Sequence, residues 1–239
     1  MEIAVIIPAR YASSRFPGKP LALISGKPMI EHVYRRIAGM EEINQIIVAT
    51  DDERIYRTVL SFGGRAEMTP SDLNSGTDRI ARVARSLSAD IIVNVQGDEP
   101  LLKQEMVREA VKPFFNDPAV IMSTLKKRIV DKKEIDNPNV VKVVTDKKNN
   151  ALYFSRYPVP FPRNKGAVYY KHIGLYVYNR KFLLDYSQWE QTPLEKSESL
   201  EQLRVLENGY NIRVVETNYN SVGVDTPEDI EEVEKSLKG

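Results

Sequence analysis

Cysteine is absent from this chain of 239 residues, and histidine occurs only twice. Without cysteine there can be no disulfide bond, no thiolate nucleophile and no cysteine-ligated zinc site. Two histidines are too few for a multi-histidine metal centre. Neither sign of charge is in excess, since 34 Lys and Arg are balanced by 33 Asp and Glu. The chain therefore has no general attraction for nucleic acid, and any anion-binding site must be local.

Three further patterns are missing. No apolar run is long enough to span a bilayer, and no signal peptide precedes the first apolar segment, so we expect a soluble cytoplasmic protein without membrane insertion. The sequence contains no Gly-x-Gly-x-x-Gly after a strand and no Gly-x-x-x-x-Gly-Lys-Ser/Thr. This absence disfavours a nicotinamide-dependent oxidoreductase and a P-loop nucleotidase.

The first loop is the most informative stretch of the sequence. Residues 3–7 form an apolar, β-branched run that predicts a strand buried on both faces, and Pro8 ends it. Arg10, Arg15 and Lys19 follow among small and turn-forming residues. Because open α/β sheets bind ligands at the carboxyl ends of their strands, these cations predict a phosphate site held by side chains. A solvated basic loop is the alternative.

The order of predicted elements indicates an α/β fold. Strands and helices alternate through the first half, which predicts a mostly parallel sheet flanked by helices. After a helix near residues 103–115 the pattern becomes β-rich, with strands expected at 120–125, 140–145, 151–155 and 173–178. A single longer helix is then predicted over residues 194–209, followed by a strand at 212–216 and a last helix.

Two polar segments lie at the end of a predicted strand or at the start of a predicted helix. Ser75-Gly-Thr-Asp-Arg79 opens a predicted helix, where free amides suit an anion or a nucleobase, although on its own the segment is better explained as an ordinary cap. Gln96-Gly-Asp-Glu-Pro100 ends a buried strand. Asp98 there either caps the next helix or binds Mg²⁺, which takes one or two carboxylates together with phosphate oxygens.

The second half offers further candidates, each with a structural alternative. Arg156 precedes a proline-rich segment that predicts an edge or a lid, and its charge could simply be exposed. His172 and Tyr176 share one face of a predicted strand, in a pocket or in the core. Thr226 and Pro227 account for the start of the last helix, which leaves Asp225 available for another role.

The segment Pro8-Ala-Arg-Tyr-Ala-Ser-Ser-Arg-Phe-Pro-Gly-Lys-Pro-Leu21 resembles the signature loop of sugar-activating cytidylyltransferases. It is most similar to the 3-deoxy-manno-octulosonate (Kdo) cytidylyltransferase family. The similarity extends in family order from Ile3 to Leu237, with Ser-Gly-Thr-Asp-Arg, Val-Gln-Gly-Asp-Glu-Pro, Tyr-Phe-Ser-Arg, His-x-Gly-x-Tyr, Leu-Glu-Gln-Leu-Arg and Val-Gly-Val-Asp-Thr-Pro. Phe16 stands where the family often has Leu, a volume-similar change.

This resemblance implies a single Rossmann-like nucleotidyltransferase domain over residues 1–239. A β-rich portion at about 120–215 would serve sugar binding and dimerisation. The implied metal ligands for Mg²⁺ are Asp98 and Asp225, which with Arg10 and Lys19 form the catalytic set. The implied nucleotide-binding residues are Ala9, Arg10, Arg15, Lys19, Ser75, Gly76, Arg79 and Gln96. The implied sugar-binding residues are Gln96, Arg156, His172, Tyr176, Glu201 and Gln202.

The expected reaction is transfer of CMP from CTP to Kdo, giving CMP-Kdo and pyrophosphate for lipopolysaccharide biosynthesis, by a homodimer. One alternative is a cytidylyltransferase for another acidic sugar, such as 8-amino-Kdo or sialic acid. Another is a non-catalytic regulator that binds CTP and releases no pyrophosphate. The residues alone do not choose among close acidic sugars, and they identify no general base.

Overall fold

The computed structural model describes residues 1–12, 16–73, 75–220 and 223–238. The chain divides into two compact units. The first unit contains Met1–Glu105 together with Asn220–Gly239, and the second contains Met106–Tyr219. The β-rich range expected from the sequence lies within the second unit. None of the described helices is long and apolar enough to cross a membrane.

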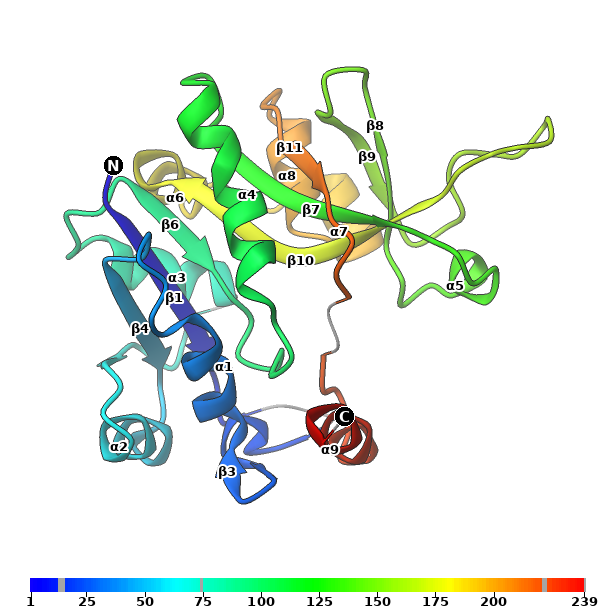
Figure 1. Ribbon diagram of the computed structural model, residues 1–239. Helices are drawn as coiled ribbons and strands as arrows, with labels where there is room; N and C mark the ends of the chain where they lie inside the picture. Colours follow the sequence, from blue (N-terminus) through cyan, green and yellow to red (C-terminus); the bar gives the residue numbers. More distant parts are fainter. Residues whose placement is uncertain (13–15, 74, 221–222, 239) are drawn as a thin grey trace. The chain divides into compact units, whose positions relative to one another are not determined.

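A parallel sheet forms the centre of the first unit (Figure 1). Strand β1 pairs with β4 on one side and with β6 on the other, and β4 pairs with β5. Their bounds are Ile3–Ala9, Gln45–Thr50, Ile91–Asn94 and Ala66–Met68 for β1, β4, β6 and β5. Residues 3–7 are at most 1% exposed, so the β-branched run is a buried central strand as the sequence predicts.

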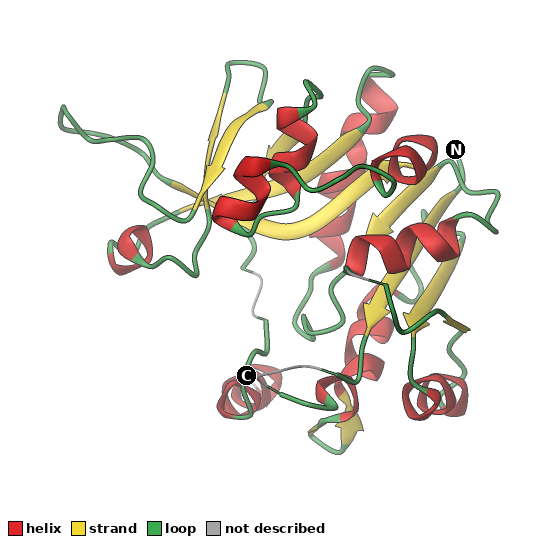
Figure 2. Cartoon of the chain, turned by 180° about the vertical axis from the view of Figure 1, so that it is seen from behind, coloured by secondary structure: helices red, strands yellow, loops and turns green. Residues whose placement is uncertain are grey.

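Helices flank this sheet (Figure 2). They are α1 (Met29–Ile37), α2 (Glu53–Ser61) and α3 (Gly76–Ala84), while Val233 of α9 (Glu228–Lys238) packs in a cluster with Ile24 and Met29. A short 3-10 helix (Lys19–Leu21) and a hairpin of β2 (Leu23–Ile24) and β3 (Lys27–Pro28) connect the first loop to α1. The alternation of strands and helices predicted for this half of the sequence is confirmed.

The second unit contains a mixed sheet. Strand β7 (Met122–Arg128) pairs antiparallel with β10 (Tyr170–Asn179) and parallel with β11 (Arg213–Glu216). Strands β8 (Lys142–Thr145) and β9 (Ala151–Ser155) form an antiparallel pair, and β8 also pairs with β10. The helices are α4 (Gln104–Asn116), α5 (Lys133–Asp136), α6 (Arg180–Tyr186), α7 (Pro193–Glu198) and α8 (Gln202–Glu207).

The single helix predicted over residues 194–209 is wrong, because α7 and α8 are separate helices. Ser199 ends α7 with a positive φ of 52°, in the left-handed region. The carbonyls of Glu198 and Ser199 accept hydrogen bonds from the Arg156 guanidinium, at 2.7 Å from Nε and 3.4 Å from Nη2. A distant side chain therefore satisfies carbonyls at the end of α7. The helical spacing of apolar residues around Leu200 gives no sign of this break.

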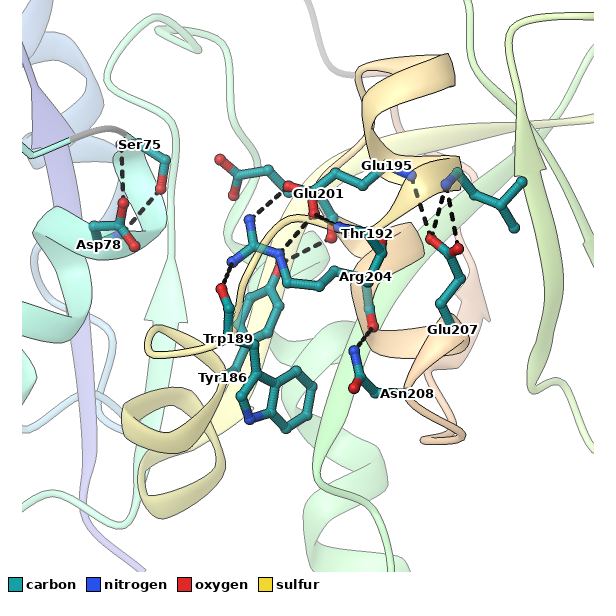
Figure 3. A network of polar contacts seen from close by, with 11 residues as sticks. Ser75, Asp78, Tyr186, Trp189, Thr192, Glu195, Glu201, Arg204, Glu207 and Asn208 are labelled. Atoms are coloured by element: carbon teal, nitrogen blue, oxygen red, sulfur yellow. Dashed lines mark hydrogen bonds and ion pairs between the residues drawn. The ribbon is translucent and has the colours of Figure 1, made fainter.

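A buried ion pair holds α7 against α8 (Figure 3). Arg204 is 6% exposed and Glu195 is 2% exposed. The guanidinium makes a two-pronged contact, with Nε 2.7 Å from Oε2 and Nη2 2.5 Å from Oε1. It also donates to the carbonyl of Trp189 at 3.2 Å and lies 5.0 Å from the ring centre of Tyr186. The hydrogen bonds with Glu195 raise the pKa of Arg204 above its ordinary value.

We expect Glu195→Gln to lower the free energy of unfolding by about 3–5 kcal/mol, because it leaves a buried guanidinium without its counter-charge. Urea denaturation followed by circular dichroism measures the change. Glu53→Gln is the matched control, since Glu53 pairs with Arg57 across an exposed face of α2 and its loss should cost less than about 1 kcal/mol. Equal losses from both variants would contradict this account of the buried pair.

Candidate active site

Lys19 brings together three separate stretches of the first unit. Its ammonium nitrogen lies 2.5 Å from Oδ2 of Asp98 and 2.8 Å from the carbonyl oxygen of Val224. It is also 3.7 Å from Oδ1 of Asp225. The lysine side chain is 15% exposed, whereas the two carboxylates are 33% and 55% exposed. Two carboxylates that are 127 positions apart in the sequence (98 and 225) thus face one cation.

Backbone contacts hold these stretches in place. The amide of Val224 donates to the carbonyl of Asp98 at 2.9 Å, and the Val224 side chain is buried in a cluster with Ile24 and Met29. Gly97 lies so close to β1 that a Cβ atom would be 2.8 Å from the carbonyl oxygen of Pro8. Only glycine therefore allows the chain before Asp98 to approach the end of β1 this closely.

Asp229 fixes the backbone that carries Asp225. One of its carboxylate oxygens accepts hydrogen bonds from the amides of Asp225 and Thr226, both at 2.8 Å. These backbone hydrogen bonds lower the pKa of Asp229, and the charge of Lys19 contributes further. The Thr226–Asp229 contact is the capping arrangement that the sequence predicts at the start of α9. Asp225 is not needed for that cap.

The arrangement suits a divalent cation. A lysine ammonium already lies within reach of both carboxylates and of a main-chain carbonyl, and these are the oxygen types that Mg²⁺ accepts. Among the described residues, no group of three or more His, Cys, Asp and Glu could hold a metal ion. Two carboxylates match Mg²⁺ bound partly by substrate phosphate, rather than a metal enclosed by protein ligands alone.

Arg79, expected to bind nucleotide, is fully buried. Its Nη2 donates to Oδ2 of Asp51 at 2.8 Å, and its Nη1 bonds to Oγ1 of Thr69. Burial lowers the pKa of Arg79, opposed by the charge of Asp51 and reinforced by the nearby charge of Arg10. Arg79 thus ties α3 to the end of β4 and lies near the half-buried Arg10, and its contact with nucleotide stays a prediction.

Ser75 and Gly76 begin α3, as the sequence indicates. The Ser75 hydroxyl accepts from the amide of Asp78 at 3.1 Å, and the Asp78 carboxylate accepts from the amide of Ser75 at 3.1 Å. Ala9 is the last residue of β1 and is buried, and the Gln96 side chain donates to Asn94 at 3.1 Å. The expected nucleotide contacts of all these residues stay predictions, and Arg15 lies outside the described residues.

The expected sugar-binding residues lie in the second unit, apart from Gln96. Arg156 already makes several contacts there. Its guanidinium bonds to the carbonyls of Glu198, Ser199 and Pro138, and its amide donates to the Glu198 carboxylate at 2.9 Å. Arg156 therefore shapes the turn that precedes Glu201 and Gln202, and its expected contact with the sugar carboxylate stays a prediction.

His172 and Tyr176 lie side by side on β10, with ring centres 5.3 Å apart. Nε2 of His172 is 2.9 Å from the hydroxyl oxygen of Thr124, and the ring of Phe154 packs edge-on at 5.0 Å. Burial lowers the pKa of His172 to about 3. Burial also raises the pKa of Tyr176 well above its ordinary value. Both rings are therefore uncharged at neutral pH and can act only through hydrogen bonds and packing.

Glu201 and Gln202 stand at the start of α8. The Glu201 carbonyl accepts from the Tyr186 hydroxyl at 2.8 Å (Figure 3), which fixes the backbone at this point. Gln202 is 3% exposed, and its Nε2 has no hydrogen-bond partner among the described residues. A buried amide with an unused donor is consistent with a polar ligand that completes it.

Three residues of these sites were not predicted from the sequence. Asp51 follows a strand at the same sheet edge as Asp98, and that rule could have indicated it. Asp52 is the cap of α2 and accepts from the amide of Arg54 at 2.9 Å, while Asp51 accepts from Arg79. Glu198 and Thr124 act through distant partners that no local pattern indicates.

Comparison with known proteins gives consistent results over the whole chain. The cytidylyltransferase family matches residues 4–216. The 3-deoxy-manno-octulosonate cytidylyltransferase of Solibacter usitatus is 56% identical over 99% of this chain and 95% of its own length. The protein of the same name from Geotalea uraniireducens is 56% identical over the full length of both chains.

Solved structures agree. The structure of CMP:2-keto-3-deoxy-manno-octonic acid synthetase complexed with CTP is 45% identical, with a TM-score of 0.96 over 100% of this chain and 99% of that one. A 4-diphosphocytidyl-2C-methyl-D-erythritol synthase from Anaerococcus prevotii, 15% identical with a TM-score of 0.65 over 100% of this chain and 99% of that one, shares the fold. With identity above one half over the full length of curated relatives, the chain belongs to the 3-deoxy-manno-octulosonate cytidylyltransferase family.

Proposed function

We propose that the protein transfers CMP from CTP to the anomeric hydroxyl of Kdo and releases pyrophosphate. The observation that carries this proposal is the full-length similarity to Kdo cytidylyltransferases, together with Asp98 and Asp225 facing one cation. The sugar hydroxyl oxygen attacks the α-phosphorus, the bond from that phosphorus to the bridging oxygen breaks, pyrophosphate leaves, and the hydroxyl proton is released to solvent. The product supplies lipopolysaccharide biosynthesis in the cytoplasm.

Arg10, Arg15 and Lys19 are proposed to bind the triphosphate. Their charges offset the negative charge that grows on the pyrophosphate as it leaves. Ser75 and Gly76 offer amides at the start of α3 to the nucleotide, and Arg79 holds that helix against β4 through Asp51. Ala9 and Gln96, at the ends of β1 and β6, complete the proposed nucleotide site, and Gln96 is also proposed to reach the sugar.

Asp98 and Asp225 are proposed to hold Mg²⁺. When bound there, Mg²⁺ polarises phosphate oxygens and lowers the pKa of a hydroxyl that coordinates it. The two carboxylates set its position, because Asp98 follows a buried strand and the Asp225 amide is tied to Asp229. With Mg²⁺ as the counter-charge of the two carboxylates, the Lys19 ammonium would be available to bind a phosphate oxygen.

Arg156, His172, Tyr176, Glu201 and Gln202 are proposed to bind the acidic sugar. The carboxylate of Kdo matches a guanidinium, and its hydroxyls match the carboxylate and amide at the start of α8. His172 is a hydrogen-bonding residue in this scheme and not a proton carrier, because its imidazole stays neutral far below pH 7. The chain therefore supplies orientation at the sugar rather than acid–base chemistry.

A homodimer is also proposed. The second unit exposes apolar side chains in and near the proline-rich segment 157–168, including Phe161 at 83% and Tyr157 at 77% exposed, with Val130 at 86%. Apolar groups left in water at this level favour burial against a second copy. Sedimentation velocity should give a dimer mass for the wild type, and a monomer at micromolar concentration would contradict the proposal.

The reaction is tested by measuring pyrophosphate release from CTP and Mg²⁺ with Kdo, 8-amino-Kdo, sialic acid or no sugar. We expect release with Kdo and none without sugar. Release with sialic acid alone would move the substrate assignment to another acidic sugar. Binding of CTP without release for any sugar would contradict the enzymatic function and favour a CTP-binding regulator.

We expect Asp98→Asn and Asp225→Asn each to lower kcat/KM by at least about 100-fold, because each removes a charged metal ligand. Asp185→Asn, a change at an exposed position of α6, is the control and should leave kcat/KM within twofold. Binding of Mn²⁺ in the presence of CTP, measured by electron paramagnetic resonance, should weaken in both site variants. Unchanged Mn²⁺ affinity in either one would remove that aspartate from the metal site.

The neutral His172 predicts a pH dependence of stability. In the unfolded chain a histidine has a pKa near 6.5, whereas in the folded protein the pKa of His172 is about 3. Between these values the unfolded state binds more protons, so the free energy of unfolding falls as pH is lowered through that window.

Between pH 7 and pH 5.5 the wild type should therefore lose about 1 kcal/mol more than His172→Gln, which cannot take up the proton. Urea denaturation at the two pH values measures this difference. His32→Gln is the control for the loss of a histidine elsewhere in the chain. Parallel pH curves for wild type and His172→Gln would show that His172 titrates normally.

A further inference from the structure

The hydroxyl of Thr124 lies at the centre of an irregular point in the sheet of the second unit. Leu125 and Thr124 are consecutive on β7, but their partners on β10, Ile173 and Tyr176, are three positions apart. Strand β10 therefore contains a bulge opposite Thr124. The Thr124 oxygen is 3.1 Å from the carbonyl of Ile173 and 2.8 Å from the carbonyl of Leu175. Both carbonyls belong to the bulge and can only accept hydrogen bonds.

A threonine hydroxyl carries one proton and can also accept. The Thr124 oxygen is only 2.8 Å from the Leu175 carbonyl oxygen, which cannot donate, so the Thr124 proton lies between these two oxygens. The third neighbour of the same oxygen is Nε2 of His172, at 2.9 Å. The hydroxyl can satisfy this contact only as an acceptor, so Nε2 of His172 must carry a proton. Thr124 is completely buried, and water does not provide an alternative partner.

A neutral imidazole carries one proton, on either Nε2 or Nδ1. Burial keeps His172 neutral at physiological pH, as its pKa of about 3 indicates. With the proton on Nε2, Nδ1 is left with a free lone pair, and it has no hydrogen-bond partner within the described part of the chain. The ring itself cannot turn freely, because Phe154 and Tyr176 pack against it and the His172 amide donates to the carbonyl of Val141 at 2.8 Å.

We propose that Thr124 is a positioning residue that fixes the tautomer of His172, so that Nδ1 accepts a hydrogen bond from a sugar hydroxyl. The inference rests on the proposed function for the identity of the sugar, and on the geometry of Thr124 for the tautomer. A fixed acceptor discriminates among ligands, because a group that presents no proton at this point leaves the Nδ1 lone pair without a donor.

The tautomer is measured by nitrogen-15 NMR of the full-length protein labelled at histidine. Only two histidines are present, so His32→Gln assigns both sets of signals by difference. Nε2 of His32 lies 2.8 Å from the carbonyl of Ile24 and must therefore also be protonated when neutral, which makes it an internal reference. We expect His172 to show a protonated Nε2 and a bare Nδ1 at pH 7. A protonated Nδ1 in the wild type would overturn the proposal, whether or not the protein is active.

Thr124→Val removes the hydroxyl while keeping the shape of the side chain. We expect the His172 signals to shift towards a mixture of tautomers and the KM for Kdo to rise about five- to tenfold, the effect of one hydrogen bond. The KM for CTP should stay within twofold. Thr124→Ser retains the hydroxyl and should restore both the single tautomer and the KM for Kdo.

A merely structural role for Thr124 would give a different result. The KM values for CTP and Kdo would then change together, or Thr124→Val would lower stability without altering the His172 tautomer, and either outcome would overturn the proposal. If Thr124→Val fails to fold, the wild type and Thr124→Ser spectra still decide the tautomer. Absence of pyrophosphate release with Kdo would refute the proposed function, whereas the tautomer measurement would stand independently.

Discussion

The lysine ammonium between two carboxylates is the contact around which the proposed site in the first unit is arranged. Lys19, Asp98 and Asp225 come from the first loop, the end of β6 and the segment before α9, so one charged group joins three regions that are remote in sequence. An isolated pair of facing carboxylates would repel, and a cation between them removes that cost. The geometry that joins these regions therefore also matches the proposed site for a divalent ion. The same three residues hold these regions together and take part in the proposed chemistry.

The second unit uses charge differently, mainly to hold backbone. Lys142 is completely buried and donates to the carbonyls of Asn137, Val140 and Arg156, and burial lowers the pKa of its ammonium. Arg156 in turn bonds to carbonyls at the end of α7. Long cationic side chains thus satisfy carbonyls that no strand or helix pairs, in a region where prolines limit regular structure. These contacts fix the loops around the proposed sugar site.

Local sequence patterns were sufficient for most of the fold. The buried run at residues 3–7, the cap at Ser75 and the change to a β pattern after α4 follow from periodicity and capping chemistry, and each appears in the structure. The break between α7 and α8 at Ser199 does not follow from these patterns, because it depends on Arg156, more than forty positions away. The same reason explains why Asp98 was found and Glu198 was not: the first follows a strand end, whereas the second is defined only by its distant partners. Contacts between residues that are far apart in the sequence leave no trace in the local sequence pattern.

The first unit is discontinuous, since residues 106–219 lie between its two parts. A ribosome making about 5–20 residues per second needs on the order of ten seconds to pass through that interval. During this time the nascent first unit lacks Val224, so the apolar cluster that contains Ile24 and Met29 is incomplete. Asp98 and Lys19 can meet early, but the second carboxylate is synthesised only after the whole second unit has emerged. The order of translation therefore delays assembly of the proposed metal-binding pair until the second unit, proposed to bind the sugar, has had time to fold.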